Sequence, residues 1–233
     1  MKRLGAFDKV RRVEPLGYAV AAIAAYFLGS FPTGLLVGKA RGIDIRTVGS
    51  GNIGATNITR ALGKKIGAVV LLVDALKGWF ACWLASRLAG AVSGTEIAAE
   101  SSTTEQLALT GAVCAILGHN YTCWLKFKGG KGIATTAGTL LALMPTAGMM
   151  CIGTWIVFLA LTRYVSIASI AAAIAVPTSA WLTDRSPLMI GVGLTVGALA
   201  IYKHKDNIRR LIAGKEHRIG EGKSKSSESE SKK

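Results

Sequence analysis

The sequence has little of what metal-dependent and covalent enzymes commonly contain. Its cysteines are few and lie in or beside apolar runs, at Cys82, Cys114, Cys123 and Cys151. We interpret them as packing residues, because their spacing fits no metal site and a buried free cysteine behaves as a small apolar side chain. No nucleophile elbow is present, and neither His119 nor His204 begins an H-x-x-x-x-D motif. We therefore expect no metal ion and no cofactor.

Acidic residues are also scarce, since 13 Asp and Glu stand against 28 Lys and Arg and give a net charge of +15. Such an excess can indicate nucleic-acid binding, but here the basic residues fall in alternate loops between apolar runs. With 51% hydrophobic residues and a mean hydropathy of +0.42, the chain is too apolar for a soluble domain of this size. We expect an all-α, polytopic membrane helix bundle with no nucleic-acid partner.

Several apolar runs have about the length needed to cross a bilayer, which is roughly 17–25 residues. They predict about seven transmembrane helices, near residues 16–38, 66–90, 106–125, 133–150, 151–163, 165–183 and 187–203. The border around Met150 is poorly defined, and hydropathy alone also allows six or eight crossings. Residues 1–15 form a basic N-terminal segment, 16–212 the membrane domain and 213–233 a low-complexity cytosolic tail, which we expect to be disordered over 221–233.

The charges of the loops predict the orientation, because Lys and Arg concentrate on the cytosolic side of membrane proteins. The basic loops lie at 39–65, at 126–131, at 163 and from 203 onward. The acidic or balanced loops lie at 96–105 and 184–185. This alternation predicts an outside N-terminus and a cytosolic C-terminus. The basic residues of the N-terminal segment oppose it, but the later loops agree with one another and carry more weight.

Glycines and small polar residues concentrate in the 48–60 segment, VGSGNIGATNITR. Glycines let successive backbone N–H groups converge on an anion, and Arg46 and Arg60 flank the segment. Its G-x-G-x-x-G match is no dinucleotide fingerprint, because no strand precedes it and no βαβ unit surrounds it. We expect an anion site here, formed by Ser50, Gly51, Asn52, Thr56, Asn57 and Arg60.

A second basic and glycine-rich stretch is the 118–138 segment, GHNYTCWLKFKGGKGIATTAG. Its candidate ligand-binding residues are His119, Lys128, Gly129, Gly130 and Lys131. The stretch fails the Walker pattern because Gly132 follows Lys131, so nucleotide hydrolysis is not indicated. Gly132 is expected to open a helix whose N-terminus directs free N–H groups at the same anion. A plain basic loop that marks the cytosolic side is the alternative.

The 202–211 segment, YKHKDNIRRL, directly follows the last apolar run. His204 and Asn207 are three residues apart and share a face if the helix continues. Both could face a pocket, although a membrane-surface helix anchored by arginines would have the same pattern. Ser166 and Ser169, at the cytosolic end of the sixth span, could bond a ligand or an adjacent helix.

Polar residues also interrupt the first two spans. In the 29–42 stretch, Ser30 and Pro32 are expected to break the end of the first span and to bare backbone groups there. Asp74 and Lys77 lie three residues apart in the second span, where an unpaired charge is costly. We expect them to pair with each other or with polar groups from the loops, as a structural pair rather than a proton relay.

Taken together, GSFPTG, VGSGNIGATN, FKGGKGIAT and HKDNIRRLIAGKE resemble the motifs of the bacterial acyl-phosphate:glycerol-3-phosphate acyltransferase family, PlsY. The resemblance covers about residues 16–220, with the motifs in the family's order. It implies seven spans in the bacterial cytoplasmic (inner) membrane and an active site that faces the cytosol. It also implies acyl transfer from acyl phosphate to the 1-hydroxyl of glycerol 3-phosphate, which gives lysophosphatidic acid and phosphate without coenzyme A. The implied partners are these two substrates and the lipid bilayer, and contact with the enzyme that makes acyl phosphate is a further expectation.

On this hypothesis, the catalytic residues are Lys131, His204 and Asn207. The residues expected to hold acyl phosphate are Ser50, Thr56, Lys128, Lys131 and either Ser166 or Ser169, and those expected to hold glycerol 3-phosphate are Arg60, His204 and Asn207. Acyl phosphate is already activated, so positioning and charge stabilisation suffice without a covalent intermediate. The general base stays open between His119, His204 and the departing phosphate.

Two other classes of function fit parts of the pattern. A transporter or channel for a phosphorylated solute would use the same glycine-rich loops but would place polar residues deep in mid-span. Here charged residues in mid-span are little more than Asp74 and Lys77, so we prefer the enzyme. A noncatalytic membrane subunit with basic docking loops would leave the glycine spacing unexplained.

Overall fold

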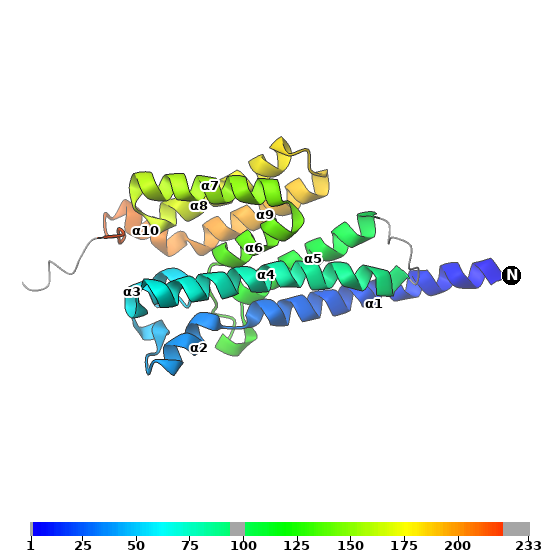
Figure 1. Cartoon of the computed structure of the whole chain (residues 1–233), viewed down its shortest axis with the longest axis horizontal. Coiled ribbons are helices and arrows are strands. Elements are labelled where there is room, and N and C mark those ends of the chain that lie inside the picture. Colours follow the sequence, from blue (N-terminus) through cyan, green and yellow to red (C-terminus); the bar gives the residue numbers. More distant parts are fainter. Residues whose placement is uncertain (1, 94–100, 221–233) are drawn as a thin grey trace, which may run out of the picture.

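The computed structural model describes residues 2–93 and 101–220, and within those ranges the regular elements are all helical (Figure 1). The α-helices are α1 (Lys2–Ser30), α2 (Thr33–Ala40), α3 (Ala55–Leu62), α4 (Lys64–Ser93), α5 (Ser101–Asn120), α6 (Ile133–Leu143), α7 (Pro145–Thr162), α8 (Val165–Leu182), α9 (Pro187–Lys203) and α10 (Lys205–Ile212). Two short 3₁₀ turns, η1 (Ile45–Thr47) and η2 (Cys123–Leu125), lie in the loops. The all-α prediction is confirmed.

The helices form two packed groups. In Figure 1, α1, α4 and α5 lie side by side along the long axis, and α7, α8 and α9 form the second group. Helix α6 packs against both α4 and α7 and so joins the groups. The short helices α2, α3 and α10 gather at one end of the molecule, away from the N-terminus.

Small residues bring backbones close together both between α4 and α6 and within the first group. Gly78 of α4 lies directly against the Thr135 carbonyl of α6, and Gly138 of α6 lies against the Ala75 carbonyl of α4. A side chain at either glycine would collide with the facing backbone. Alanines fill most of the remaining interface, at Ala21, Ala25, Ala81, Ala85 and Ala115. Close packing of small residues is the usual way in which helices associate in lipid, where the hydrophobic effect does not drive them together.

A bulkier apolar core lies where the second group packs against α5 and α6. Its buried members are Leu109, Leu140, Met144, Ala147, Cys151, Val176, Ala180 and Met189. Cys151 and the other cysteines are free thiols, and no group of His, Cys, Asp or Glu suited to a metal occurs in the part of the chain that the structure describes. The interpretation of Cys151 as a packing residue agrees with its place in this core.

Among the described residues, four helical stretches are long and apolar enough to cross a membrane: Pro15–Ala40, Lys64–Leu88, Pro145–Thr162 and Val165–Leu182. A fifth is reached if α9 and α10, bent by 54° at His204, form one span. Helix α6 has 11 residues, which at 1.5 Å per residue is about 16 Å and too short to cross a hydrocarbon core of about 30 Å.

One predicted boundary differs from the structure. The fourth and fifth apolar runs meet at Met144, not near Met150, because Pro145 takes the first position of α7. The last apolar run, predicted over 187–203, is α9, and the chain bends after it at His204 before α10. Residues 213–220 pack onto the bundle, since Glu216 is buried and the Ile219 N–H donates to the Arg163 carbonyl over 2.9 Å. The expectation of disorder over 221–233 lies outside the described residues.

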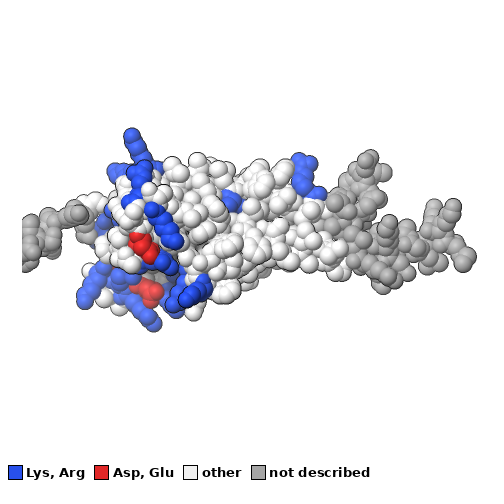
Figure 2. All heavy atoms as spheres, turned by 90° about the horizontal axis from the view of Figure 1, so that it is seen from below, with Lys and Arg blue, Asp and Glu red and all other residues white. Residues whose placement is uncertain are grey.

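The predicted break at the end of the first span is confirmed. Helix α1 ends at Ser30 and α2 begins at Thr33, with Pro32 between them. Lysines and arginines gather at the end of the molecule that carries the short helices (Figure 2). Large apolar side chains such as Leu72, Phe158 and Leu161 are exposed along the helices, as expected of surfaces that face lipid.

Candidate active site

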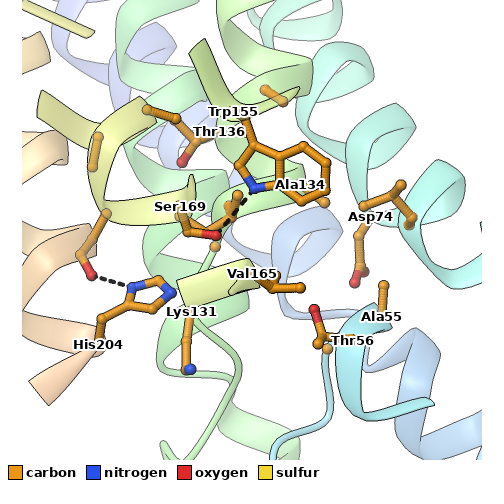
Figure 3. Close-up of a pocket in the computed structure, with 18 of the residues that line it drawn as sticks. Ala55, Thr56, Asp74, Lys131, Ala134, Thr136, Trp155, Val165, Ser169 and His204 are labelled. Carbon is orange, nitrogen blue, oxygen red and sulfur yellow. Dashed lines mark hydrogen bonds between the residues drawn. The ribbon is translucent and has the colours of Figure 1, made fainter. Parts of the chain in front are cut away.

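One cavity of about 420 Å³ opens between the two helix groups. Residues from the 48–60 segment, the 118–138 segment and the 202–211 segment all line it, together with α4, α7 and α8. Figure 3 shows Thr56, Asp74, Lys131, Ser169 and His204, from five different parts of the chain, around the same space. Segments far apart in sequence therefore meet at one site.

The 48–60 segment holds its own shape through two asparagine side chains. Asn57 is buried and donates through Nδ2 to the carbonyls of Ile45 (3.2 Å) and Val48 (2.9 Å), while its Oδ1 accepts from the Ser50 N–H (3.0 Å). Asn52 Oδ1 accepts from the Gly54 N–H over 2.8 Å. Both residues line the cavity, but their amides are engaged within the loop. Their contribution to an anion site is thus mainly to fix the loop that presents Ser50 and Thr56.

Gly51 is required in this loop by the backbone conformation and not by contact with a ligand. Gly51 has a φ of +69°, a conformation that side chains disfavour, and it lies against the Arg46 carbonyl. Gly51 is absent from the cavity lining. Arg46 forms an exposed ion pair with Asp44 (2.6 Å), whose pKa is lowered to about 2 by its hydrogen bonds from Arg46.

The 118–138 segment directs the side chains of Lys128 and Lys131 differently. Gly129 and Gly130 fold the loop back on α5, where their N–H groups donate to the carbonyls of Asn120 (3.2 Å) and His119 (3.0 Å). Lys128 is exposed and does not line the cavity, nor do Gly129 and Gly130. Lys131 faces the cavity and donates through Nζ to Asn207 Oδ1.

Helix α6 begins directly after this lysine. Gly132, with a φ of +82°, caps a helix that starts at Ile133, where the fourth apolar run was predicted to begin. Gly132, Ile133 and Ala134 all line the cavity, so the N-terminal end of the helix borders it. Free N–H groups and the helix dipole at such an end favour a bound anion.

The bend between α9 and α10 places His204 and Asn207 in the cavity wall. His204 Nδ1 lies 2.7 Å from the Ala200 carbonyl, which can only accept a hydrogen bond. Nδ1 therefore carries the proton, and Nε2 is left as an acceptor on the side of the ring that faces the cavity (Figure 3). His204 is suited to accept a hydrogen bond from a substrate hydroxyl.

His119 has a different environment. It lines the cavity and is buried, but its Nδ1 lies 2.9 Å from the Lys77 ammonium and its Nε2 edge faces Gly130. Both ring nitrogens are thus directed at protein groups. This arrangement makes His204 the better placed of the two histidines to meet a substrate.

Glu216 and Arg210 belong to the site and were not selected from the sequence. Glu216 lines the cavity, accepts from Asn207 Nδ2 through Oε1 (2.7 Å) and from Arg210 Nε through Oε2 (2.7 Å). Burial alone would raise its pKa, but these hydrogen bonds outweigh burial and lower the pKa below its ordinary value. The signal was the HKDNIRRLIAGKE motif, which runs on to Glu216, although only His204 and Asn207 were chosen from it.

The polar end of the cavity is cationic. Burial, together with the neighbouring Arg210, lowers the pKa of Lys131 to about 8, while Glu216 opposes the shift. Arg60, from α3, also lines this end, and burial lowers its pKa. Two carboxylates, those of Glu216 and, with a smaller effect, Asp206, act on Lys131. Against Lys131, Arg60 and Arg210 they leave an excess of positive charge for a dianionic phosphate.

Hydroxyl groups complete the polar end. Ser166 Oγ is buried and close to Glu216, but it has no hydrogen bond of ordinary geometry among the described residues. Ser169 Oγ accepts from Trp155 Nε1 over 3.2 Å, which sets the indole across the cavity (Figure 3). Both serines remain in a position to bond a ligand.

Beyond Trp155 the cavity is apolar. Its lining there comes from α6, α7, α8 and α9 and includes Leu140, Cys151, Ile152, Ala173, Val176 and Val196. Between Ser166 and Val176 of α8 the cavity extends about 15 Å, at 1.5 Å per helical residue. Leu71 of α4 and Ile156 of α7 line the cavity and are also exposed on the surface, so it opens sideways. A hydrocarbon chain fits such a space.

The structure therefore brings most of the predicted site residues together. Those that line the cavity are Ser50, Asn52, Thr56, Asn57, Arg60, His119, Lys131, Ser166, Ser169, His204 and Asn207. Those outside its lining are Gly51, Lys128, Gly129 and Gly130.

Comparison with known proteins identifies relatives along nearly the whole chain. Residues 19–214 match the family model described as glycerol-3-phosphate acyltransferase. The glycerol-3-phosphate acyltransferase of Geotalea daltonii is 44% identical over 198 residues, which cover 85% of this chain and 95% of that relative. That of Geobacter sulfurreducens is 42% identical over 204 residues, covering 88% and 98%.

Solved structures agree with these relatives. The crystal structure of PlsY, an integral membrane glycerol 3-phosphate acyltransferase, in its glycerol 3-phosphate form superimposes with a TM-score of 0.78 at 36% identity. The match covers 87% of this chain and 96% of PlsY. The lysophosphatidic acid form of the same enzyme gives a TM-score of 0.76. The chain is therefore a multi-pass membrane protein that belongs to the glycerol-3-phosphate acyltransferase family of the PlsY type.

Proposed function

We propose that this membrane acyltransferase moves a fatty acyl group from acyl phosphate to the sn-1 hydroxyl of glycerol 3-phosphate and forms lysophosphatidic acid and inorganic phosphate. The observation that carries the proposal is a single cavity with a cationic, hydroxyl-lined end and an apolar arm open to the side. Both substrates carry phosphate and one carries a fatty tail. A small phosphorylated solute carried by a transporter would have no hydrocarbon chain to occupy the apolar arm.

The polar end offers enough groups for two phosphates. The residues proposed to hold acyl phosphate are Ser50, Thr56, Lys131 and Ser166 or Ser169, with the N-terminal end of α6. The residues proposed to hold glycerol 3-phosphate are Arg60, His204 and Asn207. Lys128 is left out because its side chain is exposed and lies outside the lining.

Acyl transfer then needs positioning more than covalent catalysis. The glycerol 1-oxygen attacks the acyl carbon, a new C–O ester bond forms, and the bond from the acyl carbon to the phosphate oxygen breaks. Lys131 and the α6 N–H groups stabilise the negative charge that develops on the departing phosphate. His204 Nε2 accepts the hydrogen bond of the attacking hydroxyl and orients it.

The departing phosphate is the proposed acceptor of the hydroxyl proton. A proton added to His204 would face the Lys131 ammonium, and the Nδ1 of the ring bonds a carbonyl rather than a carboxylate. The imidazolium is therefore poorly stabilised there. A phosphate oxygen bound next to the hydroxyl accepts the proton as its bond to the acyl carbon breaks, which leaves no charge on the protein.

For the membrane topology, the proposal is seven crossings in the bacterial cytoplasmic membrane, with the N-terminus outside and the basic end in the cytosol. The support is the gathering of lysines and arginines at the end that carries the cavity's polar groups (Figure 2). In this topology, α5 and α9 cross the membrane beside the four long apolar stretches. Helix α6 is too short to cross alone, so the remaining crossing is made by α6 together with the non-helical residues at its two ends. Contact with the enzyme that makes acyl phosphate, at the same basic end, stays a prediction.

The proposed reaction is tested with purified protein in detergent, palmitoyl phosphate and glycerol 3-phosphate. Lysophosphatidic acid and one equivalent of inorganic phosphate are the expected products, measured by mass spectrometry and a phosphate assay. Palmitoyl-coenzyme A serves as the control donor and should give no product. Product from the coenzyme A donor alone would overturn the choice of acyl donor.

The pKa of Lys131 predicts an alkaline limit to activity. Because its ammonium is charged below about pH 8 and neutral above it, kcat/KM should fall by about tenfold per pH unit above 8, since kcat/KM reports groups of the free enzyme. Lys131→Arg keeps its charge at every accessible pH, so its residual activity should lose this fall. The measurement is a pH series of initial rates, corrected for spontaneous hydrolysis of the donor. An unchanged alkaline fall in the arginine variant would contradict the assignment to Lys131.

A further inference from the structure

A buried ion pair lies in α4 beside the cavity. Lys77 Nζ is 2.7 Å from Asp74 Oδ1, and their side chains are only 7% and 3% exposed. Asp74 also borders the cavity (Figure 3). A charge pair is expensive to bury in an apolar helix, and well-packed apolar residues would stabilise the helix at least as well. What the pair contacts therefore bears on its role.

The Lys77 ammonium has three N–H groups and meets three acceptors from three different elements. They are Asp74 Oδ1 of α4 at 2.7 Å, the Phe31 carbonyl at the α1–α2 break at 3.0 Å, and His119 Nδ1 at the end of α5 at 2.9 Å. Asp74 Oδ1 in turn accepts from the Thr33 hydroxyl of α2 at 3.0 Å. All donors of the ammonium are used, and a planar guanidinium could not point in the same three directions.

The bonds of the ion pair to Phe31 and Thr33 connect it to the 48–60 segment. Thr33 begins α2, so the bonds to Phe31 and Thr33 fix where α2 starts after the break. Helix α2 carries the loop directly, because Gly34 packs under the Ile53 carbonyl and Leu35 joins a buried cluster with Ile45, Ile53 and Ile58. A shift of α2 would move the loop that presents Ser50 and Thr56.

The hydrogen bond from Lys77 to His119 connects the ion pair to Lys131. The His119 ring packs against Gly130 so closely that no side chain fits there, and the Gly130 N–H donates to the His119 carbonyl at 3.0 Å. Gly130 immediately precedes Lys131. With Lys77 as donor, His119 Nδ1 is the acceptor and the ring is held against the loop in one orientation.

We propose that Lys77, with Asp74 as its counter-ion, is a positioning residue. It holds the 48–60 and 118–138 segments in fixed positions relative to each other, so that Thr56 and Lys131 face one substrate. The inference rests on the proposed acyl transfer and adds to it a residue that touches neither substrate.

The test separates positioning from the burial of charge. The double variant Asp74→Asn with Lys77→Met removes both charges and retains an acceptor for Thr33, but it loses the bonds to Phe31 and His119. We expect a Tm close to that of the parent and a kcat/KM lower by about thirtyfold, because small misplacements of catalytic groups have large effects on rate. The loss should appear mainly as a higher KM for both substrates, since both loops move.

The matched control is an exposed pair outside the cavity lining, Asp44 and Arg46, which are 2.6 Å apart with side chains 36% and 50% exposed. Asp44→Asn with Arg46→Met should leave kcat/KM within about twofold. An inactive parent and control would contradict the proposed reaction itself. An active parent and control, together with a fully active Asp74→Asn, Lys77→Met variant, would overturn the positioning role alone.

Gly130→Ala gives an independent check that leaves both charges in place. Its methyl group would displace the His119 ring from Lys77. We expect a rise in KM of similar size, with the protein still folded by circular dichroism. Unchanged KM values for both substrates in Gly130→Ala would contradict the link from Lys77 to Lys131.

Discussion

Lys131→Ala is expected to lower kcat/KM by roughly a thousandfold while the protein keeps its fold. Loss of a single donor that stabilises developing charge typically lowers kcat by about 10²–10³, and the variant also loses attraction for a bound phosphate. The fold should persist because the Lys131 side chain bonds only Asn207 Oδ1 among the described residues. Steady-state rates and a thermal melt, measured on the same preparation, give the two quantities.

Lys128→Ala is the matched control, because it removes a charge of the same kind from the same loop. Lys128 lies in the same loop with the same charge, but its side chain is exposed and outside the cavity lining. We expect a change of less than about threefold in kcat/KM, as for other exposed charges. Equal losses from Lys128→Ala and Lys131→Ala would mean that loop charge, and not the placement of one ammonium, supports the reaction.

His204→Ala is expected to lower kcat/KM by about a hundredfold, mainly through a higher KM for glycerol 3-phosphate. The lost interaction is the hydrogen bond from the substrate hydroxyl to Nε2, and removing one partner of a buried hydrogen bond costs about 1–3 kcal/mol. The proton would still pass to the departing phosphate, so kcat should fall less than tenfold. Initial rates over a matrix of both substrate concentrations separate the two parameters.

His204→Gln distinguishes an orienting histidine from a general base. The glutamine Oε1 can reach near the position of Nε2 and accept the same hydrogen bond, but an amide cannot take up a proton at neutral pH. We expect this variant to recover much of the affinity that alanine loses. A kcat reduced by 10² or more in both variants, with substrate binding intact, would instead identify His204 as the base.

The sequence predicted a helix boundary correctly where we used a helix-breaking residue to place it. Pro32 breaks the end of the first span as expected, because proline has no backbone N–H to donate and disfavours helical geometry at the residue before it. Hydropathy missed the border at Met144 because the apolar run continues on both sides of Pro145, although this proline, at the first position of α7, is itself a local signal for a helix start. The length of α6 was overestimated for the same reason.

The sequence predicted which segments form the candidate site, but not which of their side chains face the cavity. Residue types identified Lys128 and Lys131 equally, yet the backbone of the loop, with positive φ at Lys126, Phe127 and Gly132, turns only Lys131 into the cavity. Glu216 escaped selection because it belongs to a stretch with the composition of a tail. Its burial depends on contacts with Asn207 and Arg210 that composition does not reveal.

A structure of this protein with glycerol 3-phosphate bound is the most direct test of the claim that the 48–60, 118–138 and 202–211 segments form one substrate site. The phosphate is expected within hydrogen-bond distance of Arg60 and Asn207, with the 1-hydroxyl near His204 Nε2 and Lys131 facing the same space. A ligand held by one segment alone, with its hydroxyl remote from both His204 and Lys131, would contradict the shared site and the proposed transfer with it.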